Sequence, residues 1–106
     1  VLAQRMLEQL SYGEGERDMV ILLHEFVADY GDQQEAITST LVDFGIPGGE
    51  TAMARTVGTP AAIGAHMILE GQIRLSGVQI PVVPEIYEPI LGELEELGIA
   101  FQEKVT

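Results

Sequence analysis

The sequence predicts an α+β fold, a β-sheet with helices packed on it, and three patterns support that prediction. Two apolar and β-branched stretches, 19–26 and 36–44, flank the polar turn GDQQE, which is typical of an antiparallel hairpin. Amphipathic helical patterns occur at the start of the chain and at residues 84–97. A strand, helix and strand at the end of the chain can form a βαβ unit. We therefore expect one domain over residues 1–106, with a mixed sheet built from the hairpin and the βαβ unit.

The first half of the chain is predicted to form a helix and the hairpin. One helical face of the first ten residues is apolar, and the glycines of SYGEGE end that helix; the face consists of Leu2, Met6, Leu7 and Leu10. The strand at 19–26 is apolar on both of its alternating faces. Strands of this kind usually lie in the centre of a sheet, so we expect it there rather than at an edge.

The middle of the chain, TAMARTVGTPAAIGAHMILEG, predicts two consecutive helices. Thr59 followed by Pro60 is typical of an N-cap before proline at the first helical position, so we expect helices near 51–57 and 60–70. Small residues stand where a solvent-facing helix would carry charges, and we call them the small-residue surface: Ala54, Gly58, Ala61, Ala62, Gly64 and Ala65. Such a surface lets another helix or sheet approach closely, either from this domain or from a missing one.

The last third of the chain is predicted to contain the βαβ unit. GVQIPVV at 77–83 is a short strand, placed near a sheet edge or strand end by its proline. PEIYEPILGELEELG is an amphipathic helix closed by Gly98, with glutamates opposite an apolar stripe of Tyr87, Ile90, Leu91, Leu94 and Leu97. IAFQEKV alternates as a strand with one apolar face would.

Composition excludes several classes of partner. The formal charge of −12, from 17 acidic and 5 basic residues, repels phosphate backbones and anionic lipid, so we expect no nucleic acid and no membrane partner. Without cysteine the chain can form no disulfide or thiolate metal site, which fits a reducing cytoplasm. A hydrophobic content of 46% is high for a small domain, so we expect a partner or another domain to cover apolar surface.

The loop GIPGGET and the helix after it contain the candidate substrate-binding residues. Free backbone N–H groups at a helix N-terminus can hold an anion, and Gly49 and Thr51 stand at that point. Glu50 places negative charge there, and a plain turn explains the loop equally. Arg55 would be a fixed cation for a substrate carboxylate, so Arg55→Ala is expected to weaken binding of an acidic substrate.

No complete catalytic or metal-binding pattern is present. The chain has no GxGxxG loop, and GEGERD continues into acidic residues and precedes a strand rather than a helix. His24 and His66 share no local ligand spacing, so we expect no metal site and assign no catalytic residue.

Four segments together resemble the C-terminal part of the glutamate-forming saccharopine dehydrogenase family: ERDMVILLHEF, TSTLVDFG, TAMARTVGTPAAIGAHMILEGQI and PEIYEPILGELEELGI. The resemblance extends from about Leu10 to Lys104, and its most specific element is AMARTVG followed by PAAI. Two positions depart from the family pattern. Thr51 stands where serine is common, and Glu50 stands where an aromatic residue or histidine often occurs.

The resemblance implies part of an oxidoreductase of lysine metabolism that interconverts saccharopine with glutamate and aminoadipate semialdehyde. It implies an N-terminal nucleotide-binding domain for NAD or NADP, a mixed-sheet domain for substrate and dimerisation, and a helical insertion. Because this chain has no glycine-rich loop, we expect it to bind no cofactor and to be inactive alone. We expect a homodimer, with the small-residue surface covered by the second subunit or by the N-terminal domain.

Two other interpretations remain. The chain can belong to a related lysine 6-dehydrogenase or carboxynorspermidine dehydrogenase, in which we expect the stretch PEIYEPILGELEELGI to look different. It can also be a freestanding, non-catalytic α+β module that binds an amino acid or a partner protein. A reading frame that continues upstream into a strand–GxGxxG–helix unit would exclude the freestanding module.

Overall fold

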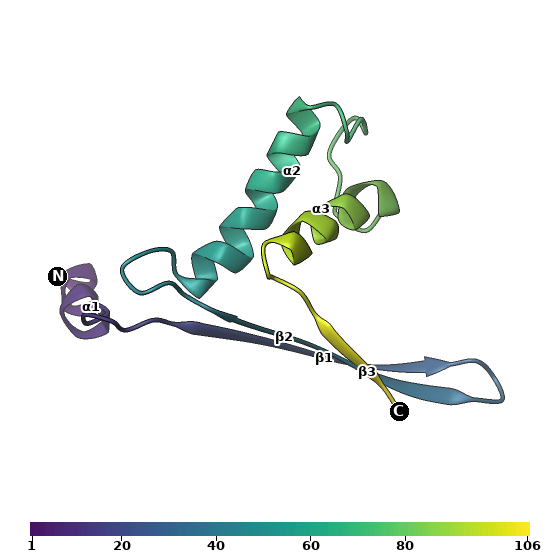
Figure 1. The fold of residues 1–106 in the computed structure, drawn as a ribbon, viewed down its shortest axis with the longest axis horizontal. Coiled ribbons are helices and arrows are strands. Elements are labelled where there is room, and N and C mark those ends of the chain that lie inside the picture. Colours follow the sequence, from purple (N-terminus) through teal and green to yellow (C-terminus); the bar gives the residue numbers. More distant parts are fainter.

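The computed structural model describes all of residues 1–106 and combines helices with one three-stranded sheet. In chain order its elements are α1 (Leu2–Leu10), β1 (Met19–Asp29), β2 (Gln34–Phe44), the π-helical turn η1 (Ala54–Gly58), α2 (Thr59–Leu69), α3 (Pro84–Glu96) and β3 (Gln102–Val105). Figure 1 shows a long hairpin with α2 and α3 on one side of it and α1 at one end. The predicted α+β class is confirmed.

The sheet has the strand order β1-β2-β3, and both pairs of neighbours are antiparallel. The hairpin is paired along its whole length, from Met19 opposite Phe44 to Asp29 opposite Gln34. The predicted hairpin is therefore confirmed. The predicted central position of its first strand is wrong for this chain, because β2 lies in the centre and β1 forms an edge.

The predicted βαβ unit does not form. Residues 77–83 contain bends and turns but no strand, and β3 pairs antiparallel with β2. Pro81 has no N–H to donate to a ladder, and Val78, Ile80 and Val82 are all exposed. Without a neighbouring strand, nothing holds this stretch in extended pairing. The sheet of this chain is therefore purely antiparallel rather than mixed.

The two helices predicted in the middle of the chain are one continuous helix. Gly58 and Thr59 both have right-handed helical dihedrals, so Thr59 is a residue inside the helix and not an N-cap. The π-helical turn η1 lies just before Pro60, where the proline cannot supply a backbone donor. The predicted end is confirmed: Gly71 has φ +72°, and the N–H of Gln72 donates to Met67 O at 2.9 Å. This is the Schellman arrangement.

The core is small and joins β2, α2 and α3. It consists of Leu41, Ile63, Met67, Ile73, Leu94 and Ile99, with Ile86 and Ile90 packed against it. Only 10 of 106 residues are buried, and none of them belongs to α1 or β1. The predicted apolar faces of the first helix and of β1 are therefore left largely open to solvent.

The molecule is more open than a compact protein of the same size. Its radius of gyration is 18.0 Å, whereas about 13 Å is expected for a compact chain of this length. Its accessible surface is 8348 Å², whereas a compact monomer of this mass exposes roughly 5,800 Å². The excess of roughly 2,500 Å² exceeds the area buried in a standard protein–protein interface. No helix has the length and apolarity that a membrane crossing requires.

The small-residue surface is mostly uncovered by the chain itself. Gly64 is half-buried, and a Cβ at that position would lie 3.6 Å from Ile90 Cδ1 of α3. Here the helices approach closely, as the small residue predicts. The other five members of the surface are exposed.

Candidate functional site

The loop before the long helix closes on itself. Ile46 N donates to Glu50 O, and Gly49 N donates to Ile46 O, both at 2.8 Å. Gly48 has φ +69°, a conformation that glycine adopts without strain. Because the N–H of Gly49 is bonded inside this turn, it is not free to hold an anion.

The anion at the helix N-terminus belongs to the protein itself. Asp18 Oδ1 accepts from Ala52 N at 2.7 Å, and Asp18 Oδ2 accepts from Met53 N at 3.2 Å. Thr51 Oγ1 accepts from Ala54 N at 3.0 Å, so Thr51 is the N-cap. The bond from Ala52 is the main reason that the pKa of Asp18 lies below its ordinary value of 3.8. Three N–H groups of the first turn are thereby satisfied.

Arg55, which the sequence suggests as a cation for a substrate carboxylate, is paired with a carboxylate of the same chain. Its Nε donates to Asp43 Oδ2 at 3.0 Å and its Nη2 donates to Asp43 Oδ1 at 3.3 Å, which makes a forked pair. The side chains are 20% and 8% exposed, with Asp43 the more buried. The hydrogen bond to Asp43 raises the pKa of Arg55 further above its ordinary value. Nη1 makes no hydrogen bond within the chain and is the atom left to meet another group.

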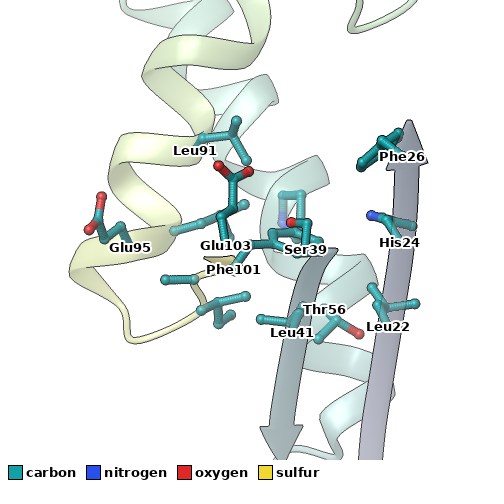
Figure 2. A pocket seen from close by; sticks show the side chains of 14 residues that line it. Leu22, His24, Phe26, Ser39, Leu41, Thr56, Leu91, Glu95, Phe101 and Glu103 are labelled. Carbon is teal, nitrogen blue, oxygen red and sulfur yellow. The ribbon is translucent and has the colours of Figure 1, made fainter. Parts of the chain in front are cut away.

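A cavity of about 510 Å³ lies between the sheet and the helices, and we call it the sheet cavity. Its 14 lining residues come from β1, β2, η1, α2, α3 and the segment that leads into and includes β3. Figure 2 shows Leu22, His24 and Phe26 on the strand β1, with Leu91 and Glu95 on the α3 side. Thr56 lines the cavity, whereas Gly49, Thr51 and Arg55 do not.

Three polar residues of the cavity form one row across the sheet. His24 is paired with Ser39, and Ser39 is paired with Glu103. Directly paired residues share a face of the sheet, and all three line the sheet cavity. Ser39 stands between the other two, so the histidine does not link a hydroxyl to a carboxylate as a Ser-His-acid triad requires. The row is therefore suited to binding and not to nucleophilic catalysis.

Aromatic and aliphatic side chains form the walls around this row. The His24 ring stacks on Phe101 with ring centroids 5.5 Å apart and lies 5.9 Å from the ring of Phe26. Ser39 is 5% exposed, and its hydroxyl makes no side-chain hydrogen bond within the chain. Glu95 and Glu103 add carboxylates, and no basic lysine or arginine lines the cavity.

The sequence analysis missed this cavity and the role of Asp18. The row depends on the β2–β3 register, which joins residues 39 and 103 and has no local sequence signal. Asp18 lies 34 positions before the amide that it binds. One partial signal was present: Asp18 comes just before a strong strand pattern, and Gly45 follows the strand paired with it. A Cβ at Gly45 would overlap Asp18 Oδ1, so the glycine makes room for the cap.

Comparison with known proteins identifies the class of this chain: it is a C-terminal domain of a dehydrogenase. Residues 1–99 match the family model described as the saccharopine dehydrogenase C-terminal domain. The chain belongs to this family, and the resemblance found in the sequence is confirmed.

Individual relatives agree with the family assignment. The chain is 45% identical over 107 residues to the NADP(+), L-glutamate-forming saccharopine dehydrogenase of Saccharomyces cerevisiae, a match to 99% of this chain and 24% of that protein. It is 44% identical to the alpha-aminoadipic semialdehyde synthase of Arabidopsis thaliana over 93% of this chain and 10% of the synthase. The chain thus spans about a quarter of the first protein's length and about a tenth of the second's.

A solved structure shares the fold. The apo saccharopine dehydrogenase (L-Glu forming) from Saccharomyces cerevisiae superposes with a TM-score of 0.88 and 44% identity, covering 99% of this chain and 24% of that one. The open hairpin with two helices on one side is therefore the arrangement that this segment has within a longer enzyme chain.

Proposed function

We propose that the chain acts as the C-terminal part of an NADP-dependent saccharopine dehydrogenase of the L-glutamate-forming type. The observation that supports this proposal is the 45% sequence identity to the yeast enzyme over 99% of this chain. The proposed reaction oxidises the C–N bond of saccharopine with NADP⁺, and water then releases glutamate and aminoadipate semialdehyde. The N-terminal nucleotide-binding domain of the longer polypeptide would hold the cofactor, and the present chain would contribute scaffold to the substrate domain.

Within this proposal, Arg55 is the candidate contact for a substrate carboxylate. Asp43 fixes the guanidinium through Nε and Nη2, and this leaves Nη1 free to donate. Thr51 would act indirectly, by capping the helix that presents Arg55. Gly49 would shape the turn before it, through the bond from its N–H to Ile46 O.

The test is an assay of the full-length polypeptide that contains this chain. Purified protein is given NADP⁺ or NAD⁺ with saccharopine, lysine or carboxynorspermidine, and formation of reduced cofactor is followed by absorbance. We expect turnover with saccharopine and NADP⁺, and no turnover when the 106-residue chain is assayed alone. Preference for lysine or carboxynorspermidine would replace the proposal with one of the related dehydrogenases.

We further propose that the longer protein is a cytoplasmic homodimer without nucleic acid or membrane partners. The excess accessible surface of this chain supports a covering domain or subunit, and the charge of −12 opposes polyanionic partners. The cattle relative, an alpha-aminoadipic semialdehyde synthase, is described as mitochondrial, so cell fractionation is the measurement that decides the compartment. The same surface argues against a freestanding binding module, which would bury more of its apolar residues.

A further inference from the structure

We propose that the sheet cavity is a docking site for another segment of the same longer polypeptide, one that places a basic side chain among apolar residues. This inference rests on the proposed function in one respect, because it requires the longer chain. The match covers 24% of the yeast relative, so about three quarters of such a polypeptide lies outside this chain.

The walls of the cavity call for an apolar occupant. Leu22 and Phe26 of β1 face Leu91 on the α3 side (Figure 2), and all three remain at least 40% exposed. Exposure of this apolar surface to water is unfavourable, and a partner that covers it gains stability in proportion to the area covered. The cavity volume of about 510 Å³ is sufficient for several side chains.

The polar row of His24, Ser39 and Glu103 indicates that the apolar occupant also carries a positive charge. Glu103 contributes a carboxylate, Ser39 contributes a hydroxyl that makes no side-chain hydrogen bond within the chain, and His24 completes the row. Glu95 adds a second carboxylate to the lining, and no lysine or arginine of this chain reaches it. A lysine or arginine keeps an apolar stem and a charged end, so it can pack on the walls and pair with Glu103 at once.

A protein segment fits this site better than a small free amine. On the same face of the sheet, the apolar surface continues past the cavity to Val105, which is paired with Ile37, the partner of Phe26, and is exposed. A small ligand would fill the cavity and leave this adjoining surface in water. A segment of chain can cover both.

The rest of the polypeptide also fits better than a second copy of this chain. Two copies would each bring a net charge of −12, in which the 5 basic residues of each copy are already counted. Repulsion between such chains opposes contact at a site that already holds two carboxylates.

The experiment places a photoreactive p-benzoylphenylalanine at Leu22 in the full-length polypeptide. After irradiation, mass spectrometry identifies the joined peptide, and mixed light and heavy isotope labelling separates links within one chain from links between two. We expect an intrachain link to a segment outside these 106 residues that contains a lysine or arginine beside apolar residues. The matched control is the same group at Val78, which is fully exposed and does not line the cavity.

A second measurement tests the charge pairing without depending on the cross-linker. Glu103→Gln should speed hydrogen exchange of the β3 amides by at least about tenfold in the full-length protein, since a charge-assisted hydrogen bond is lost. Glu88→Gln on the exposed side of α3 should not change it. Equal exchange rates of the β3 amides in the two variants would contradict the proposal that a basic side chain pairs with Glu103.

The outcomes separate this inference from the proposed function. An interchain link, a link to a segment without a basic residue, or no link at Leu22 would overturn the docking proposal, even in a protein that oxidises saccharopine. The expected intrachain link in a protein inactive on saccharopine would uphold the docking site and reject the proposed function.

Discussion

At the scale of single residues, the ion pair between Arg55 and Asp43 gives a prediction for stability. Arg55→Ala should lower the free energy of unfolding by about 1–3 kcal/mol, because Asp43, whose side chain is 8% exposed, would lose both donors. The double variant Arg55→Met with Asp43→Leu should recover most of that loss, since no charge is then left unpaired. Urea unfolding of the full-length polypeptide measures both. A double variant less stable than Arg55→Ala would contradict a role in pairing.

Arg55 also gives a prediction for substrate binding that is separate from its effect on stability. If Nη1 meets a substrate carboxylate, Arg55→Ala should raise KM for saccharopine by about tenfold or more, with a smaller change in kcat. Asp43→Asn keeps the guanidinium and loosens only its fixation, so it should raise KM less. An unchanged KM in Arg55→Ala would remove Arg55 from the substrate site.

Asp18 predicts a pH dependence of stability. Its folded pKa lies below the ordinary 3.8, so the charged carboxylate contributes stability above that pH, and the contribution is lost as pH falls through the lower, folded value. Asp18→Asn should therefore be less stable than the wild type near neutral pH, with a gap that closes below about pH 4. Urea midpoints from pH 7 to pH 2.5 give the comparison, and the exposed Asp32→Asn serves as control. A stability difference between wild type and Asp18→Asn that stays constant over this pH range would contradict the role of the Asp18 carboxylate at the helix N-terminus.

These residues show how far local sequence signals extend. The importance of Arg55 and the position of Thr51 at a helix start could be predicted from a few neighbouring residues. Their partners could not, because Asp18 reaches Ala52 only after the hairpin has formed, and Asp43 reaches Arg55 across a loop. Thr59 is not the predicted N-cap, because the π-helical turn η1 joins directly onto α2 and the helix continues through Pro60.

At the scale of elements, two glycines near the end of α3 predict opposite effects. Gly98 has φ +79°, so Gly98→Ala should cost about 1 kcal/mol through backbone strain alone, since nothing lies within 4 Å of the new methyl group. Gly92 lies inside α3 and also has open space around it, so Gly92→Ala should stabilise the helix by about 0.5–1 kcal/mol. Thermal unfolding of both variants tests the pair, and the same sign for both would contradict it.

Elements that depend on local periodicity were predicted well, and those that depend on a neighbour were not. The hairpin, α1, α3 and the end at Gly71 follow from spacing and turn residues. Residues 77–83 have the composition of a strand, but a strand needs a paired partner, and this chain offers none there. The apolar pattern of β1 similarly predicted burial on two faces, whereas the chain covers neither face fully.

At the scale of the whole molecule, the isolated 106-residue chain should self-associate. The face of the hairpin opposite Leu41 exposes apolar side chains in cross-strand pairs, including Met19 with Phe44 and Ile21 with Val42. Sedimentation velocity should show oligomers that increase with concentration, and Ile21→Lys should reduce them. A monomer at high concentration, with the same surface still exposed, would contradict this expectation.

The free side of β1 has its own consequence for how this polypeptide folds. Eleven residues there have only β2 as a neighbour, so alternate amide and carbonyl groups of the strand point outward without a backbone partner in the sheet. A strand from elsewhere in the longer chain can extend the ladder at that border, and so can a strand from an unrelated nascent chain. If the correct strand pairs with this edge early in folding, the sheet is completed; if it pairs late, the exposed edge promotes aggregation.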